Sequence, residues 1–312
     1  MNEPATTTNE PLPVTVIGGY LGAGKTTLVN HLLRNADGLR IAVLVNEFGT
    51  LPIDADLIEA QDENVIAIAG GCVCCSYGND LIMAMIELAE MEPRPERVLL
   101  EASGVALPGA IAASVGLLQH YRLDGVIVMA DAETVCGLAD DIYMGDTITR
   151  QLQDADLIVV NKVDLISESR RSQIDVWFQE RFPDAKQVAA ERAFLPLEIV
   201  FDSIAPKQPR PHHHSSNHGD LFETMTFGVT DPVNPHRLAE ELVADDLGII
   251  RAKGFVRTAK SDNCEIQLVG KRTSVALAEP SESLGLVCIG IASQLNRALI
   301  SRAVARAATR DV

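Results

Sequence analysis

The chain has 312 residues, of which 47% are hydrophobic and 22% are charged, and its formal net charge is −17 at pH 7. This charge argues against binding to nucleic acid or to an acidic membrane, and the length predicts one large domain with a smaller one beside it. Because the first residues are polar, unlike a secretory signal, and no apolar run approaches a membrane span, we expect a cytoplasmic protein with free thiols.

Strands and helices alternate along the first two thirds of the chain, after a polar segment, residues 1–10, that we expect to be a disordered tail. Short apolar runs predict buried strands. We expect strands at residues 14–18, 41–48, 65–69, 97–101, 125–131 and 157–161, and helices at residues 25–33, 80–90, 147–152 and 168–182. The alternation predicts an α/β fold, in which helices cover both faces of a mostly parallel sheet.

A segment rich in proline, serine and histidine, residues 205–220, interrupts this pattern and predicts a linker between domains at residues 11–204 and 221–312. The linker contains four of the seven histidines, so it is either a polar connector or a weak metal-collecting site. A smaller α+β domain is expected after it. Its strands are predicted at residues 222–229, 249–257, 264–268 and 286–290, and its helices at residues 235–243 and 295–308.

The segment GYLGAGKTT, residues 19–27, follows the first predicted strand and opens the first predicted helix. It matches G-x-x-x-x-G-K-[ST], the phosphate-binding P-loop, and so predicts a P-loop NTPase. Glycines let backbone amides converge on phosphate oxygens, Lys25 brings a positive charge to the β- and γ-phosphates, and Thr26 can ligate Mg²⁺. The nucleotide-binding residues expected here are Gly19, Gly22, Ala23, Gly24, Lys25, Thr26 and Thr27.

Two further motifs follow predicted strands. In NKVD, which contributes Asn161, Lys162 and Asp164, the aspartate can accept two hydrogen bonds from guanine but would face a lone pair on adenine, so GTP is the expected nucleotide. The alternative role for Asp164 is a helix cap. In EASG, Glu101 ends a strand at the edge where ligands bind in open α/β sheets, and it is our candidate for coordinating Mg²⁺. The alternative role for Glu101 is simply to end the strand.

Three of the six cysteines lie within four positions, as Cys72, Cys74 and Cys75. They could form a buried cluster, a redox pair or a metal site, and soft thiolates select Zn²⁺, Cu⁺ or Co²⁺ over Mg²⁺. As metal ligands they leave one tetrahedral position open for water, Glu47 or a partner's ligand. The isolated cysteines are predicted to be packing residues; they are Cys136, Cys264 and Cys288.

Taken together, these motifs resemble the CobW-type P-loop GTPases, metallochaperones related to the nickel-insertion GTPases HypB and UreG. The resemblance extends to the second domain, where RAKGFV, residues 251–256, is similar to a signature of the CobW C-terminal domain. It implies GTP hydrolysis involving Lys25, Thr26 and Glu101, and binding of Zn²⁺ or a similar ion, such as Co²⁺, by the three cysteines. The segment NEFG, residues 46–49, and Asp54 fall in the region that the resemblance implies should respond to the γ-phosphate. The resemblance has a departure: many members of the family carry a tryptophan near the end of the C-terminal domain, whereas the only tryptophan here, Trp177, is in the first domain.

The sequence therefore predicts a GTP-hydrolysing metallochaperone that uses GTP and Mg²⁺ and delivers Zn²⁺ or a similar ion to a client metalloprotein or biosynthetic enzyme. No nucleic acid or membrane is expected among its partners. Two alternatives remain open at this point. One is a metal buffer without delivery, and the other is a nucleotide-switch adaptor with redox-sensing cysteines.

Overall fold

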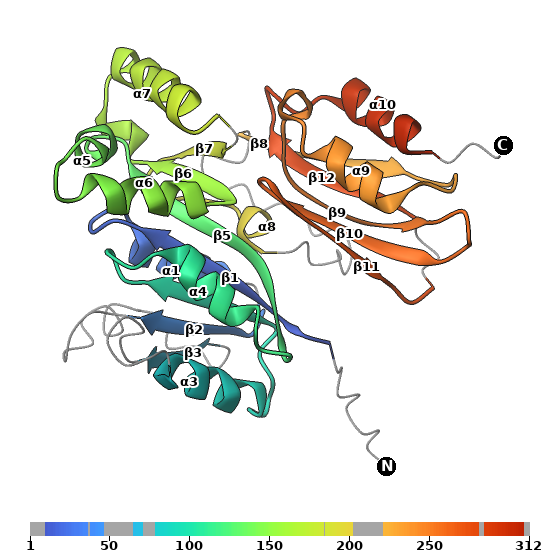
Figure 1. The fold of residues 1–312 in the computed structure, drawn as a ribbon, viewed down its shortest axis with the longest axis horizontal. Helices are drawn as coiled ribbons and strands as arrows, with labels where there is room; N and C mark the ends of the chain where they lie inside the picture. The colour runs from blue at the N-terminus through green and yellow to red at the C-terminus, as the bar shows by residue number, and fades with distance from the viewer. Residues whose placement is uncertain are drawn as a thin grey trace.

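The computed structural model describes residues 10–36, 38–46, 65–70, 79–183, 185–201, 221–280 and 284–308, which form two sheets and the helices packed on them (Figure 1). The first sheet has seven described strands in the order β3-β2-β4-β1-β5-β6-β7, and every pair is parallel. They are β1 (Leu12–Gly19), β2 (Ile41–Asn46), β3 (Val65–Gly70), β4 (Arg97–Ala102), β5 (Tyr121–Asp131), β6 (Leu157–Asn161) and β7 (Lys186–Ala190).

Helices cover both faces of this sheet, which confirms the expected α/β P-loop NTPase architecture (Figure 1). One face carries α3 (Asn79–Ala89), α4 (Pro108–Val115), α5 (Val135–Ala139), α6 (Gly145–Asp154) and α7 (Glu168–Arg181). The other carries α1 (Lys25–Arg34) and the short α8 (Leu197–Val200). Side chains alternate between the two cores along β1, so that Val14 and Val16 face one and Ile17 the other.

The second sheet is antiparallel, with five described strands in the order β11-β10-β9-β12-β8. Its strands are β8 (Phe222–Gly228), β9 (Ile249–Arg257), β10 (Asn263–Val269), β11 (Arg272–Leu277) and β12 (Gly285–Ile291). The helices α9 (Pro235–Leu242) and α10 (Arg297–Ala307) pack on one face. The opposite face contributes Ile250 and Ile289 to a core of the first domain.

The sequence predicted most of these elements but not α4, α5, α8, β7 and β11. Of the strand expected at residues 41–48, the structure describes Ile41–Asn46, and the last two positions lie outside the described residues. The expected tail and the linker at residues 205–220 fall mainly outside the described residues, so the domain boundaries stay predictions. Among the described helices, none combines the length and apolar character needed to cross a bilayer.

A buried ion pair joins the two sheets. Arg251 on β9 is 2% exposed and donates hydrogen bonds of 2.8 and 2.7 Å to the two carboxylate oxygens of Asp124 on β5. Its other terminal nitrogen donates to the carbonyl oxygens of Ile199 and Val200 at 3.3 and 3.1 Å. Arg251 opens the RAKG signature, so the motif noted in the sequence is a domain contact.

A second contact lies where the turn between β10 and β11 meets the start of β6. The Nε of Arg272 donates to Oδ2 of Asp156 at 2.7 Å, and the same oxygen accepts a hydrogen bond of 2.9 Å from the backbone N–H of Val126. A Cβ atom at Gly270 would lie 1.6 Å from the carbonyl oxygen of Asp156, and the φ angle of this glycine is +55°. Only glycine allows the turn to approach so closely.

We expect Arg251→Met to lower the free energy of unfolding by about 3–5 kcal/mol, because it leaves the Asp124 carboxylate buried without its bidentate donor. Denaturant titration measures this change. Arg306→Met is the matched control, since Arg306 and Glu241 form a pair whose side chains are 54% and 23% exposed, and such pairs contribute up to ~1 kcal/mol. Equal destabilisation by the two variants would contradict the importance of the buried pair.

Candidate functional site

The P-loop connects β1 to α1 at the carboxyl edge of the first sheet. Three of its glycines have positive φ angles, +128° at Gly19, +76° at Gly22 and +105° at Gly24. A Cβ at Gly19 would lie 2.2 Å from the carbonyl oxygen of Met129, and one at Gly24 would lie 2.5 Å from Nδ2 of Asn161. Glycine is therefore required at both positions, for conformation and for space.

Two side chains at the start of α1 point back into the site. Lys25 is buried, and its Nζ donates to the carbonyl oxygen of Tyr20 at 3.3 Å. The hydroxyl of Thr26 donates to Oε1 of Glu101 at 2.8 Å. Glu101 is 2% exposed and lies on β4, opposite Ile17 of β1. The structure thus brings together Thr26 and Glu101, which are 75 residues apart and were both predicted to face Mg²⁺. Their hard oxygen atoms fit that ion.

Asn161, at the end of β6, connects two loops of the site. It is buried; its Nδ2 donates to the carbonyl oxygen of Ala23 at 2.9 Å, and its Oδ1 accepts from the backbone N–H of Ala193 at 2.7 Å. This amide therefore holds the P-loop against the loop that follows β7.

The other two residues of NKVD have different environments. Lys162 has a φ angle of +64°, and its Nζ forms an ion pair with Asp131 at 2.6 Å, which gives that aspartate a structural partner. Asp164 is exposed, in a 3-10 turn at Val163–Leu165. It does not cap the following helix, because the side chain of Ser167 accepts the hydrogen bond from the N–H of Arg170. The capping alternative for Asp164 is therefore wrong.

The loop after β7 is a part of the site that the sequence analysis missed. Arg192 and Ala193 have φ angles of +50° and +57°, although neither is glycine. The hydrogen bond from Ala193 to Asn161 holds this loop in place, and Phe194 packs edge-on against His31 with 4.5 Å between ring centroids. The available signal was the short KQVAA run that forms β7, one strand further along the sheet from NKVD.

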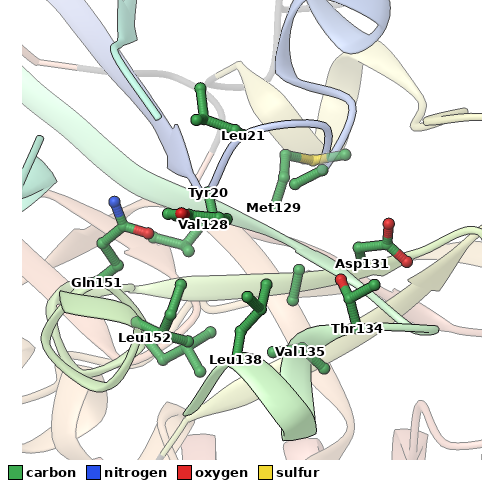
Figure 2. A pocket seen from close by; sticks show the side chains of 13 residues that line it. Tyr20, Leu21, Val128, Met129, Asp131, Thr134, Val135, Leu138, Gln151 and Leu152 are labelled. Atoms are coloured by element: carbon green, nitrogen blue, oxygen red, sulfur yellow. The ribbon is translucent and has the colours of Figure 1, made fainter. Parts of the chain in front are cut away.

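A small pocket adjoins the P-loop on the other side (Figure 2). Tyr20 and Leu21 of the loop face residues of α5 and α6 across it, including Leu138 and Gln151. Gln151 is a second functional candidate that the sequence did not single out.

Several predicted site residues lie outside the described residues: Glu47, Asp54, Cys72, Cys74 and Cys75. In the part of the chain that is described, no group of three or more His, Cys, Asp or Glu side chains could hold a metal ion.

The three isolated cysteines behave as packing residues, as predicted. Cys264 and Cys288 are buried in the core of the second domain, and Cys136 packs partly buried in the first. Burial raises the pKa of the Cys288 thiol to about 12 and also raises the pKa values of the other two. Since a thiolate is the form that binds metal, these three thiols are poor ligands at neutral pH.

Comparison with protein families gives two matches that together span most of the chain. Residues 13–189 match the CobW/HypB/UreG nucleotide-binding domain, and residues 222–308 match the cobalamin synthesis protein cobW C-terminal domain. Apart from Leu12 and Ala190 at the ends of the first sheet, the described sheets fall within these two ranges.

Individual relatives cover similar lengths. A protein named zinc chaperone CobW from Sinorhizobium is 31% identical, over 84% of this chain and 86% of its own. Its namesake from Pseudomonas aeruginosa is 32% identical, over 92% of each chain. A zinc-regulated GTPase metalloprotein activator from Dictyostelium discoideum is 28% identical, over 79% of this chain and 63% of its own.

We expect Asn161→Ala to weaken binding of a fluorescent guanosine diphosphate by roughly tenfold or more, because two buried backbone groups lose their partner at ~1–3 kcal/mol each. Fluorescence titration measures the dissociation constant. The control is Asn35→Ala at the exposed end of α1, which should leave the constant unchanged. Wild-type affinity in the Asn161 variant would show that the bridge between the loops is not needed.

Proposed function

The chain belongs to the CobW family of P-loop GTPases, and from that premise we propose that it is a GTP-dependent metallochaperone. In this proposal it binds Zn²⁺ or a similar divalent ion through its C-x-C-C segment, residues 72–75, and delivers the ion to a client protein. The observation that carries the proposal is the register of three neighbouring strands. Asn46 of β2 lies between Gly70 of β3 and Ala102 of β4, in one row at the carboxyl edge.

This register supports a metal site beside the nucleotide site. The described part of β3 ends at Gly70, two residues before Cys72, and the described part of β2 ends at Asn46, directly before Glu47. Glu101 lies on β4 one residue before that row, paired with Val45 of β2. The segments that carry the three cysteines and Glu47 therefore follow neighbouring strands, and Glu101 lies on the strand beside them.

The nucleotide side of the proposal rests on side chains that are described. The P-loop amides and Lys25 would bind the phosphates, and Thr26 and Glu101 would hold Mg²⁺. When bound, the ion supplies positive charge that neutralises the β- and γ-phosphate oxygens. Lys25 already points across the loop toward the carbonyl of Tyr20, so its charge is held at the P-loop. Asp54 and the NEFG segment are proposed to respond to the γ-phosphate.

Base recognition is assigned to Asp164, whose exposed carboxylate is free of the helix-capping role. Asn161 and the ion pair of Lys162 with Asp131 hold the surrounding loop. A carboxylate can accept from both guanine N–H groups, and adenine would leave it without donors. GTP is thus the proposed nucleotide.

The metal cargo is assigned to Cys72, Cys74 and Cys75, with water, Glu47 or a client's ligand in the fourth position. The names of the relatives, zinc chaperone and zinc-regulated GTPase metalloprotein activator, support Zn²⁺ as the cargo. An open position suits transfer better than a closed structural site does. Thiolate ligands require a reducing compartment, so we propose that the protein acts in the cytoplasm.

We expect Zn²⁺ to bind roughly 5–150-fold more tightly with a non-hydrolysable GTP analogue than with GDP, the usual range of coupling between two sites. Competition with a chromogenic chelator measures both constants. Cys74→Ala should abolish tight binding in either state, whereas the matched Cys136→Ala should preserve both values. Equal affinities with the two nucleotides would identify a metal buffer instead, and tight binding by Cys74→Ala would remove the proposed ligand set.

We expect Asp164→Asn to weaken GTP binding by roughly 10- to 150-fold, because hydrogen bonds to a charged group contribute about 1.5–3 kcal/mol. Inosine triphosphate, which lacks the exocyclic amino group, should lose less affinity than GTP. Calorimetric titration of both nucleotides measures the effect. Asp175→Asn, at an exposed position of α7, is the control. An unchanged ratio between the two nucleotides would assign base recognition elsewhere.

A further inference from the structure

Gln151 on α6 is a buried amide that donates two hydrogen bonds to the segment that follows Glu101. Only 1% of its surface is exposed. Its Nε2 donates to the carbonyl oxygen of Gly104 at 3.1 Å and to that of Ala106 at 2.8 Å. Both N–H groups of the amide are therefore used on two carbonyls, three and five residues after Glu101.

The same helix holds this segment at a third point, one turn further on. Oδ2 of Asp154 accepts a hydrogen bond of 2.9 Å from the backbone N–H of Gly109, in the first turn of α4. A Cβ at Gly109 would lie 2.5 Å from the carboxylate carbon of Asp154, so the helices approach closely. The path from Glu101 to α4 thus lies against α6.

On its other side, the segment between Glu101 and α4 packs closely against β1 and the P-loop. A Cβ at Gly104 would lie 2.4 Å from Cδ2 of Leu21, and one at Gly18 would lie 2.9 Å from Cβ of Pro108. The segment is therefore enclosed between the P-loop and α6. Figure 2 shows Gln151 on one side of the pocket and Tyr20 with Leu21 on the other.

We propose that Gln151 is a positioning residue for the GTPase reaction: its amide fixes residues 104–106 and so holds the Glu101 carboxylate against Thr26. The proposal rests on the proposed role of these two residues in binding Mg²⁺. Gln151 touches neither of them and acts through the backbone. Without its two N–H donors, the carbonyls of Gly104 and Ala106 lose their buried partner, and the segment is free to shift toward other donors. Small displacements of this kind have large effects on rate.

The test compares Gln151→Met, which keeps the length and loses both donors, with Gln153→Met, a matched change at an exposed position of the same helix. For Gln151→Met we expect kcat for GTP to fall roughly 10- to 100-fold, with KM changed by less than about threefold. Steady-state phosphate release measures both. Gln153→Met should keep the wild-type values.

Two readouts separate positioning from simple loss of stability. The Mg²⁺ concentration for half-maximal tightening of GDP binding should rise roughly fivefold or more in Gln151→Met. Amides of residues 103–110 should lose hydrogen-exchange protection in the GDP–Mg²⁺ complex. If Gln151→Met lowers only the melting temperature, and leaves kcat, the Mg²⁺ requirement and exchange at wild-type values, the proposal is overturned. Gln151→Glu, which also lacks the donors, provides the same test if the methionine variant does not fold.

Thr26→Ala and Glu101→Gln distinguish a failure of this proposal from a failure of the proposed Mg²⁺ site. Both should raise the Mg²⁺ requirement. If they do and Gln151→Met does not, only the positioning role is wrong. If neither does, the assignment of Mg²⁺ to Thr26 and Glu101 is wrong, and the role of Gln151 falls with it.

Discussion

All described strands of the first sheet run in the same direction, so the loops that follow them meet at one edge. This constraint explains how residues far apart in the sequence come to share a site. The P-loop follows β1, Glu101 is the next-to-last residue of β4, Asp131 ends β5 and Asn161 ends β6. The hydrogen bond between Thr26 and Glu101 exists because β1 and β4 are neighbours in the sheet.

Side-chain amides connect these loops by hydrogen bonds to backbone groups of neighbouring segments. Asn161 bonds the P-loop to the loop after β7, and Gln151 bonds α6 to the segment after Glu101. Each uses a small, neutral, buried group that can donate, which avoids the cost of burying a charge. Loops held in this way can keep a fixed backbone geometry without regular secondary structure of their own.

The sequence was a good guide to the first sheet because buried parallel strands contain continuous apolar runs, as in the LIVV of β6 and the VLL of β4. It failed for β7, whose KQVAA opens with two polar residues, and for β11, a partly exposed edge strand. The helix α4 was missed since PGAIAASV has small residues and little amphipathic contrast.

The P-loop, Glu101 and NKVD could be recognised because their chemistry requires particular residue types. The hydrogen-bond partners of Gln151 and Asn161 could not be predicted from the sequence. A buried glutamine that bonds a distant backbone carbonyl has no local signal, and neither do the positive φ angles of Arg192 and Ala193.

The apolar face of the second sheet makes the two domains depend on each other for burial of their side chains. Ile250 and Ile289 fill a core whose other members belong to the first sheet and its helices. An excised first domain would therefore expose part of its own interior to water, and Asp124 would lose the hydrogen bonds from Arg251. The two sheets are separate in their strand pairing, yet they share a core, so neither buries all of its apolar side chains alone.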